Sequence, residues 1–204
     1  MKKFFLLFLA NFFLFGCASS RIESKFSPVY VTNSAVYKIL PPELMEGHFD
    51  GMQRMNAKFA KNEFEAEIYV IANDEQLSMT IMSEFGTTVA ELYYDGEELD
   101  FASSVFPKNL RAEYIVADFQ FCLYDIDALK SALEKAGVDF EVWLEEMPDG
   151  NWAESRILRQ KGKTIAKVTK KYEKNLKTKA NELKSIKYEN FLRGYSYELT
   201  GDLE

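Results

Sequence analysis

Few residues of this chain have the type and spacing that catalysis needs. His48 is the only histidine, and no Gly-x-Ser-x-Gly motif offers a serine nucleophile for it to activate. Three pairs of nearby carboxylates could act as acid and base: Glu97 with Glu98, Glu145 with Glu146, and Asp125 with Asp127. Each pair lies at an expected turn, strand end or helix start, where acids commonly serve solvation and capping. We therefore expect that the protein is not an enzyme.

The residue types that form metal and cofactor sites are also scarce. One histidine and one cysteine besides Cys17 do not assemble a zinc site without unusual carboxylate ligands, and no phosphate-binding glycine loop is present. The formal net charge of −7 argues against binding to nucleic acid. We expect no metal, no cofactor and no nucleic-acid partner, and we expect Cys122 to be a small buried apolar residue.

Cys17 is the residue with the clearest chemistry. Two lysines precede an apolar segment, Phe4–Phe15, whose length is typical of a signal peptide and too short for a membrane span of about 20 residues. Leu14, Gly16 and Cys17 resemble the lipobox of bacterial lipoproteins, in which the cysteine thiol is acylated and becomes the new N-terminus. The resemblance implies lipidation of Cys17. With Ala18 in place of aspartate, it also implies attachment to the outer membrane, with the domain facing the periplasm.

Two alternatives remain open for this segment: a plain signal peptide that contains a cysteine, and an uncleaved N-terminal anchor. In the lipoprotein interpretation, residues 1–16 are the signal peptide and residues 17–42, rich in serine and proline, are the lipidated N-terminus and tether. Near the end of this tether, Tyr37, Ile39 and Leu40 are expected to contact the folded part. Residues 43–204 then form a single folded domain.

Alternating apolar and polar residues predict an antiparallel sheet. Phe64, Ala66, Ile68 and Val70 alternate with glutamates and a tyrosine, and similar alternation recurs to residue 101 and again after residue 137. Asp-Gly or Lys-Gly pairs at 95–96, 149–150 and 161–162 predict turns between strands.

Two segments in the middle of the chain have a helical period instead. Apolar residues recur three and four positions apart from Ala112 to Leu123, and a second helix is expected from Asp125, its N-cap, to Gly137. The fold class that follows is mainly β: one curved antiparallel sheet or half-barrel of about nine to eleven strands, covered by two amphipathic helices.

The surplus of aromatic and methionine residues suggests a binding cavity. Such side chains suit a flexible apolar pocket between a curved sheet and its helices, although plain core packing would also account for them. The candidate cargo-binding residues occupy apolar faces of the expected elements: Phe64, Ile68, Leu77, Met79, Ile81, Phe101, Ile115, Phe119 and Leu123.

A basic run near the C-terminus offers a different interpretation. Residues 159–187 hold 11 basic residues and two acids in an otherwise acidic chain. This run could be a solvated strand face, or a patch that docks an envelope protein and makes the protein a structural adaptor. The candidate patch residues are Lys163, Lys167, Lys170, Lys171 and Lys174.

Short motifs along the chain resemble one protein family. They are Leu40-Pro41-Pro42, Gly47, Gln53-Arg54, Leu77-Ser78-Met79-Thr80, Phe85-Gly86, Asp95-Gly96, Leu110 to Tyr114, Asp118-Phe119-Gln120, Tyr188-Glu189-Asn190 and Gly194-Tyr195 to Leu199. Together they are similar to an uncharacterised family of outer-membrane lipoproteins, a domain of unknown function often encoded near fatty-acid-synthase-like or aryl-polyene genes. That family resembles the LolA and LolB lipoprotein carriers in design. The resemblance implies a curved sheet that binds or shuttles a lipid or acylated cargo.

Overall fold

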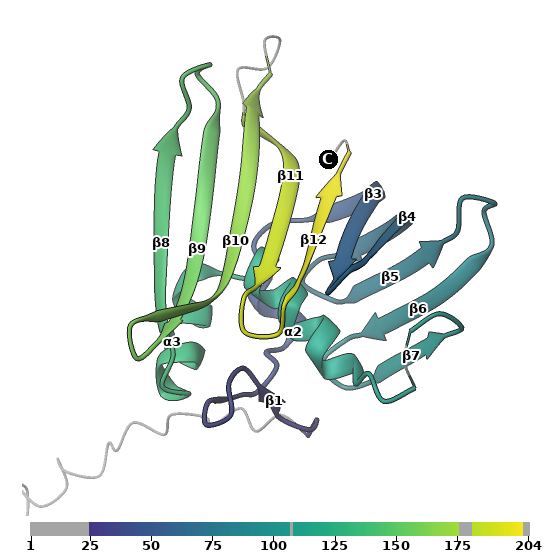
Figure 1. Ribbon diagram of the computed structural model, residues 1–204, viewed down its shortest axis with the longest axis horizontal. Coiled ribbons are helices and arrows are strands. Elements are labelled where there is room, and N and C mark those ends of the chain that lie inside the picture. Colours follow the sequence, from purple (N-terminus) through teal and green to yellow (C-terminus); the bar gives the residue numbers. More distant parts are fainter. Residues whose placement is uncertain (1–24, 107, 176–180, 202–204) are drawn as a thin grey trace, which may run out of the picture.

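The computed structural model describes residues 25–106, 108–175 and 181–201. Its main feature is a ten-stranded antiparallel sheet in the order β7-β6-β5-β4-β3-β12-β11-β10-β9-β8 (Figure 1). The ten strands are β3 (Phe49–Phe59), β4 (Asn62–Ala72), β5 (Leu77–Met82), β6 (Thr88–Tyr94), β7 (Leu99–Ser103), β8 (Asp139–Glu146), β9 (Trp152–Gln160), β10 (Lys163–Lys174), β11 (Asn181–Asn190) and β12 (Tyr195–Thr200). The strand number and antiparallel pairing confirm the predicted fold class.

Two helices connect the two edges of the sheet. α2 (Ala112–Leu123) and α3 (Ile126–Lys135) follow β7 at one edge and precede β8 at the other, so this connection crosses one face of the curved sheet (Figure 1). All other neighbours in the sheet are joined by hairpins, except β3 and β12, which pair in its middle. The sheet therefore consists of two half-sheets, β3–β7 and β8–β12, that meet at the β3–β12 pair.

Local chemistry explains the turns and helix ends that the sequence predicts. In the 95–98 turn, Asp95 Oδ1 accepts the backbone N–H groups of Glu97 and Glu98 at 2.7 and 2.6 Å, and Gly96 takes a φ of +88°. At the start of α3, Asp125 Oδ1 accepts the N–H of Ala128 at 2.8 Å. These contacts confirm the predicted hairpin and the predicted N-cap.

The segment expected to be a tether is partly folded. Its residues form a short hairpin, β1 (Val29–Tyr30) with β2 (Val36–Tyr37), and a one-turn helix, η1 (Pro42–Leu44). The Tyr37 hydroxyl donates to Gln120 Oε1 at 2.7 Å, and Gln120 Nε2 donates to the carbonyl of Leu40 at 2.6 Å. The side chains of Tyr37, Ile39 and Gln120 are buried, so this part of the segment packs on the folded domain, as expected for Tyr37 and Ile39. Cys17 and the expected signal peptide lie outside the described residues.

Strand β8 is less buried than the alternation of its sequence suggests. Phe140 of β8 is buried, but Trp143 and Leu144, on opposite faces, are 62% and 69% exposed. The reason is position, because β8 is an edge strand and the upper part of β8 projects past the helices (Figure 1). Alternation alone does not reveal which strand lies at an edge.

Candidate functional site

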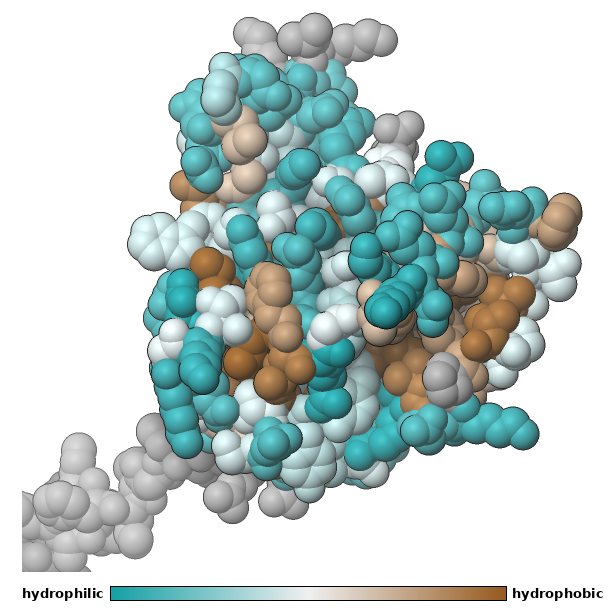
Figure 2. All heavy atoms as spheres, viewed as in Figure 1, coloured by the Kyte–Doolittle hydropathy of each residue, from teal (hydrophilic) through white to brown (hydrophobic). Residues whose placement is uncertain are grey.

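A cavity of about 800 Å³ lies between α2 and the β3–β7 half-sheet. Apolar and aromatic side chains form most of its wall: Met55, Ala57, Phe59, Phe64, Met79, Ile81, Ala90, Leu92, Phe101, Phe106, Tyr114, Ile115, Phe119, Tyr195 and Tyr197. The side of the molecule shown in Figure 2 is hollowed and brown over the β5–β7 region beside α2. A concave, mainly apolar hollow of this size is typical of a small-molecule site.

Periodicity explains how the cavity wall is built. Tyr114, Ile115, Asp118 and Phe119 are spaced three and four positions apart, so they share one face of α2. Alternate residues of β3 to β6 face that helix, because side chains of a strand alternate between its faces. Ring pairs stiffen the wall, for example Phe119 stacked on Tyr197 with centroids 5.9 Å apart.

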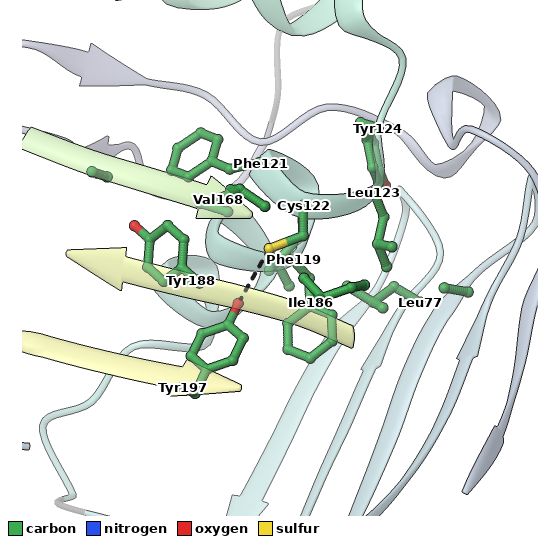
Figure 3. Close-up of a cluster of buried hydrophobic side chains, with 14 of the residues drawn as sticks. Leu77, Phe119, Phe121, Cys122, Leu123, Tyr124, Val168, Ile186, Tyr188 and Tyr197 are labelled. Atoms are coloured by element: carbon green, nitrogen blue, oxygen red, sulfur yellow. Dashed lines mark hydrogen bonds between the residues drawn. The ribbon is translucent and has the colours of Figure 1, made fainter. Parts of the chain in front are cut away.

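Six of the nine candidate cargo residues line this cavity: Phe64, Met79, Ile81, Phe101, Ile115 and Phe119. The other three, Ile68, Leu77 and Leu123, lie outside it and are almost completely buried in the closed core. Figure 3 shows Leu77 and Leu123 in the packed cluster around Cys122. Ile68, Leu77 and Leu123 therefore contribute to the packed core and not to the cavity wall.

Several lining residues lacked a signal strong enough to select them from the sequence. Ala57 and Ala90 contribute space rather than contacts, and small residues among large ones are not distinctive. Phe106 lies in the loop after β7, where no periodicity applies. Tyr195 and Tyr197 are not among the candidate cargo residues, although they occupy the same face of β12 as the buried Leu199.

Asp118 is the acidic group that faces the cavity from α2. Its Oδ2 accepts a hydrogen bond from the Tyr195 hydroxyl at 2.6 Å. The side chain is partly exposed, and its surroundings include the apolar cavity wall. Desolvation raises the pKa of Asp118 to about 7, against the lowering effect of hydrogen bonds from Tyr195 and Tyr188 and of the positive charge of Arg193.

The raised pKa of Asp118 predicts a pH dependence of stability. The folded-state pKa of about 7 exceeds the ordinary value of 3.8, so the folded protein binds more protons than the unfolded chain between these values. This group should therefore lower the free energy of unfolding as the pH rises from about 4 to about 7, by at most about 1.4 kcal/mol per pH unit. Urea unfolding of wild type and Asp118→Asn over this range should show an advantage of the variant that grows with pH.

A variant that lacks an exposed carboxylate is the control for the general effect of removing one negative charge. Asp100→Asn removes an exposed acid of β7 and should differ from wild type by a nearly constant amount across the same range. If Asp118→Asn behaved like Asp100→Asn, the carboxyl of Asp118 would not be desolvated as described.

Two arginines lie where the cavity meets the surface. Arg111 precedes α2, Arg193 lies in the β11–β12 turn, and both line the cavity together with Tyr114. Their guanidinium carbons are 5.2 and 4.9 Å from the centroid of the Tyr114 ring, within cation–π range. Arg111 Nη2 donates to the carbonyl of Pro28 at 2.9 Å, and Arg193 Nη2 donates to that of Tyr30.

An ionic cluster centred on Arg156 of the other half-sheet is buried except for Glu46, whose side chain is half-exposed. The fully buried Arg156 donates to Glu154 Oε1 at 2.6 Å, to Glu46 Oε2 at 2.7 Å and to the carbonyl of Tyr124 at 2.6 Å. Lys170 Nζ lies 3.3 Å from Glu154 Oε1. Burial lowers the pKa of Lys170. For Glu154, burial acts upward, but Lys170 and Arg156 hold its pKa below the usual value.

This ionic cluster divides the candidate basic patch. Lys170 is only 4% exposed and shares the inward face of β10 with Ala166 and Val168, so it is not available at the surface. Lys167 and Lys171 have the opposite parity and lie on the outer face. Lys163 and Lys174, at the two ends of β10, are exposed. The five lysines therefore do not form one continuous docking surface.

The remaining candidate groups, Cys122 and His48, are not among the residues that line the cavity. Cys122 is buried, its Sγ lies 3.7 Å from the Tyr197 hydroxyl (Figure 3), and burial raises the pKa of its thiol to about 12. His48 is exposed in the segment before β3. Within residues 25–106, 108–175 and 181–201, no three His, Cys, Asp or Glu residues are placed to hold a metal ion. No helix in these ranges is long and apolar enough to cross a membrane.

Comparisons with known proteins give one family and several solved structures, one of which is described here. A family model described as "Protein of unknown function (DUF3261)" matches residues 50–201. No curated protein matches the chain. A crystal structure of an outer membrane lipoprotein-sorting protein domain from Vibrio parahaemolyticus aligns with a TM-score of 0.35 and 11% identity, over 78% of this chain and 85% of that one. A similarity of this size does not identify a function.

Proposed function

Because the chain belongs to the DUF3261 family of proteins of unknown function, we propose a function from its cavity: non-catalytic binding of a lipid or other acyl-type cargo. The membership confirms the resemblance of the sequence motifs to a family of unknown function. The observation that supports the proposal is the cavity of about 800 Å³, whose wall is mainly apolar and aromatic. Its volume lies within the roughly 300 to 1,000 Å³ of typical ligand pockets, so it suits a cargo of that size.

Burial of the chain supplies the affinity in this proposal. Each methylene moved from water into the cavity contributes about 0.8 kcal/mol, which corresponds to a factor of about four in affinity. The methionines Met55 and Met79 in the wall adapt to chains of different shape, because their side chains are unbranched and flexible.

A series of saturated fatty acids of increasing length tests the proposed function. Calorimetric titration should give dissociation constants that fall about fourfold for each added methylene until the cavity is filled, and then become constant. Mass spectrometry of organic extracts of the purified protein should detect a co-purified amphiphile. Dissociation constants independent of chain length, together with an extract free of lipid, would overturn the proposal.

We further propose that the domain is anchored to the outer membrane through an acylated Cys17 and faces the periplasm. The support is the sequence alone: two lysines, an apolar segment and the Leu-x-Gly-Cys motif that ends at Cys17. Cells grown with labelled palmitate should incorporate the label into the wild-type protein and not into Cys17→Ser. Equal labelling of both would show that Cys17 is not the acylated residue.

A further inference from the structure

We infer that the cargo is an anionic amphiphile whose head group is bound by Arg111 and Arg193 at the mouth of the cavity. The inference rests on the proposed function, because it assigns the chemistry of the group that remains outside the apolar wall. It is supported by three observations: where the arginines lie, how little of their charge is neutralised, and where the nearby acids lie.

The two guanidinium groups come from distant parts of the chain to one place. Arg111 and Arg193 both line the cavity, and both pack near the ring of Tyr114, at 5.2 and 4.9 Å from its centroid. The ring restricts both side chains and so lowers the entropic cost of ordering them around a ligand. The mouth therefore presents two partly fixed positive charges beside an apolar interior.

Both arginines retain unused capacity to bind an anion. Arg193 forms no ion pair with any carboxylate in the described part of the chain, and its Nη2 donates to the backbone carbonyl of Tyr30. Arg111 reaches Glu113 at 3.4 Å, longer than the roughly 2.7 to 2.9 Å of a strong charged hydrogen bond. Because a guanidinium has five N–H donors, most donors of both groups remain for a ligand.

The acids of the cavity wall offset this charge only in part. Glu91 alternates along β6 with the inward-facing Ala90 and Leu92, so its carboxylate points to the outer face of the sheet. Asp118 lies nearly two helical turns from Arg111. It is close enough to Arg193 for their charges to attract, but its printed hydrogen bond is with the Tyr195 hydroxyl rather than with either arginine. The N-terminal end of α2 adds a partial positive charge beside Arg111.

The combination specifies one class of ligand. Guanidinium groups bind carboxylate and phosphate groups through paired hydrogen bonds, and the apolar wall accepts a hydrocarbon chain. A cationic head group would be repelled by both arginines, and a neutral one would leave their donors unused. Fatty acids and phosphate-bearing lipids share the required chemistry.

A set of ligands with one chain and different head groups tests the inference. Laurate, dodecyl phosphate, dodecanol and dodecyltrimethylammonium should be titrated into wild type, Arg193→Gln, Arg111→Gln and the control Arg159→Gln. Arg159 lies on β9 and pairs with Glu141, away from the cavity lining. Wild type and Arg159→Gln should bind the two anions about tenfold more tightly than dodecanol, the factor expected for one charged hydrogen bond.

In Arg193→Gln and Arg111→Gln, the preference for the two anions over dodecanol should fall to about twofold or less, and dodecanol should bind as it does to wild type. Equal affinity of wild type for all four head groups would overturn the inference and leave the proposed function standing. No binding of any of the four would instead overturn the proposed function. Inorganic phosphate should also be titrated into the wild type. If it bound as tightly as dodecyl phosphate, the arginines would form a site for free anions and the inference would be wrong.

Discussion

Replacing Arg156 with methionine should destabilise the protein by about 3 to 5 kcal/mol, the usual cost of removing one partner from a buried ion pair. The side chain of Arg156 is fully buried and donates to two carboxylates and to the carbonyl of Tyr124 at the end of α2. Without the guanidinium, Glu154 keeps only Lys170 as a cationic partner. The carbonyl of Tyr124 loses a donor that carries a positive charge at a helix C-terminus.

Thermal unfolding measures this effect directly. For a chain of this size the expected loss corresponds to a fall in Tm of roughly 6 to 20 °C. Arg159→Met is the matched control, since it removes another arginine of β9 whose ion pair with Glu141 is partly exposed, and it should cost about 1 kcal/mol or less. If both variants lost the same small amount, Arg156 would not be holding α2 to the second half-sheet.

Replacing Ala57 with phenylalanine should weaken acyl-chain binding by more than tenfold. Ala57 lies on β3 between its register partners Phe64 of β4 and Tyr197 of β12, and all three line the cavity. A phenyl ring there occupies the space of several methylenes, each of which contributes a factor of about four to affinity. Filling an existing cavity commonly stabilises a protein, so the free energy of unfolding should stay the same or rise.

Ala102→Phe provides the same change of side chain outside the cavity. Ala102 is exposed on β7, with the parity opposite to that of the cavity-lining Phe101. Its calorimetric titration with laurate should match that of wild type. Unchanged laurate binding by a folded Ala57→Phe variant would mean that the ligand binds elsewhere, which would remove the main support for the proposed function.

The fold class could be predicted because it depends on local signals. Strand periodicity, the Asp95-Gly96 turn and the N-cap at Asp125 are each determined by residues close in sequence. The limit of the tether was not predictable in this way. The contact of Tyr37 with the folded part was expected, but its partner Gln120 was not, because a contact between distant residues has no signature in either segment.

The cavity was predictable in character but not in position. Strand parity selects the inward face, which holds both Ile68 and its register partner Ile81. Only Ile81 lines the cavity, because the placement of α2 over the curved sheet decides which part of that face is filled. Strand alternation could have removed Lys170 from the candidate basic patch, since Lys170 occupies the same face of β10 as the apolar Ala166 and Val168.

The pairing of β3 with β12 has a consequence for how the chain folds. The first and last strands of the sheet are neighbours, with Phe59 opposite Tyr195, although almost the entire sheet and both helices lie between them in sequence. Such long-range pairing slows folding, because a long loop must close before the contact forms. Until β12 has been synthesised, β3 has no pairing partner on that side. During this time the unpaired edge of β3 is open to pairing with a wrong strand, and the addition of β12 closes it.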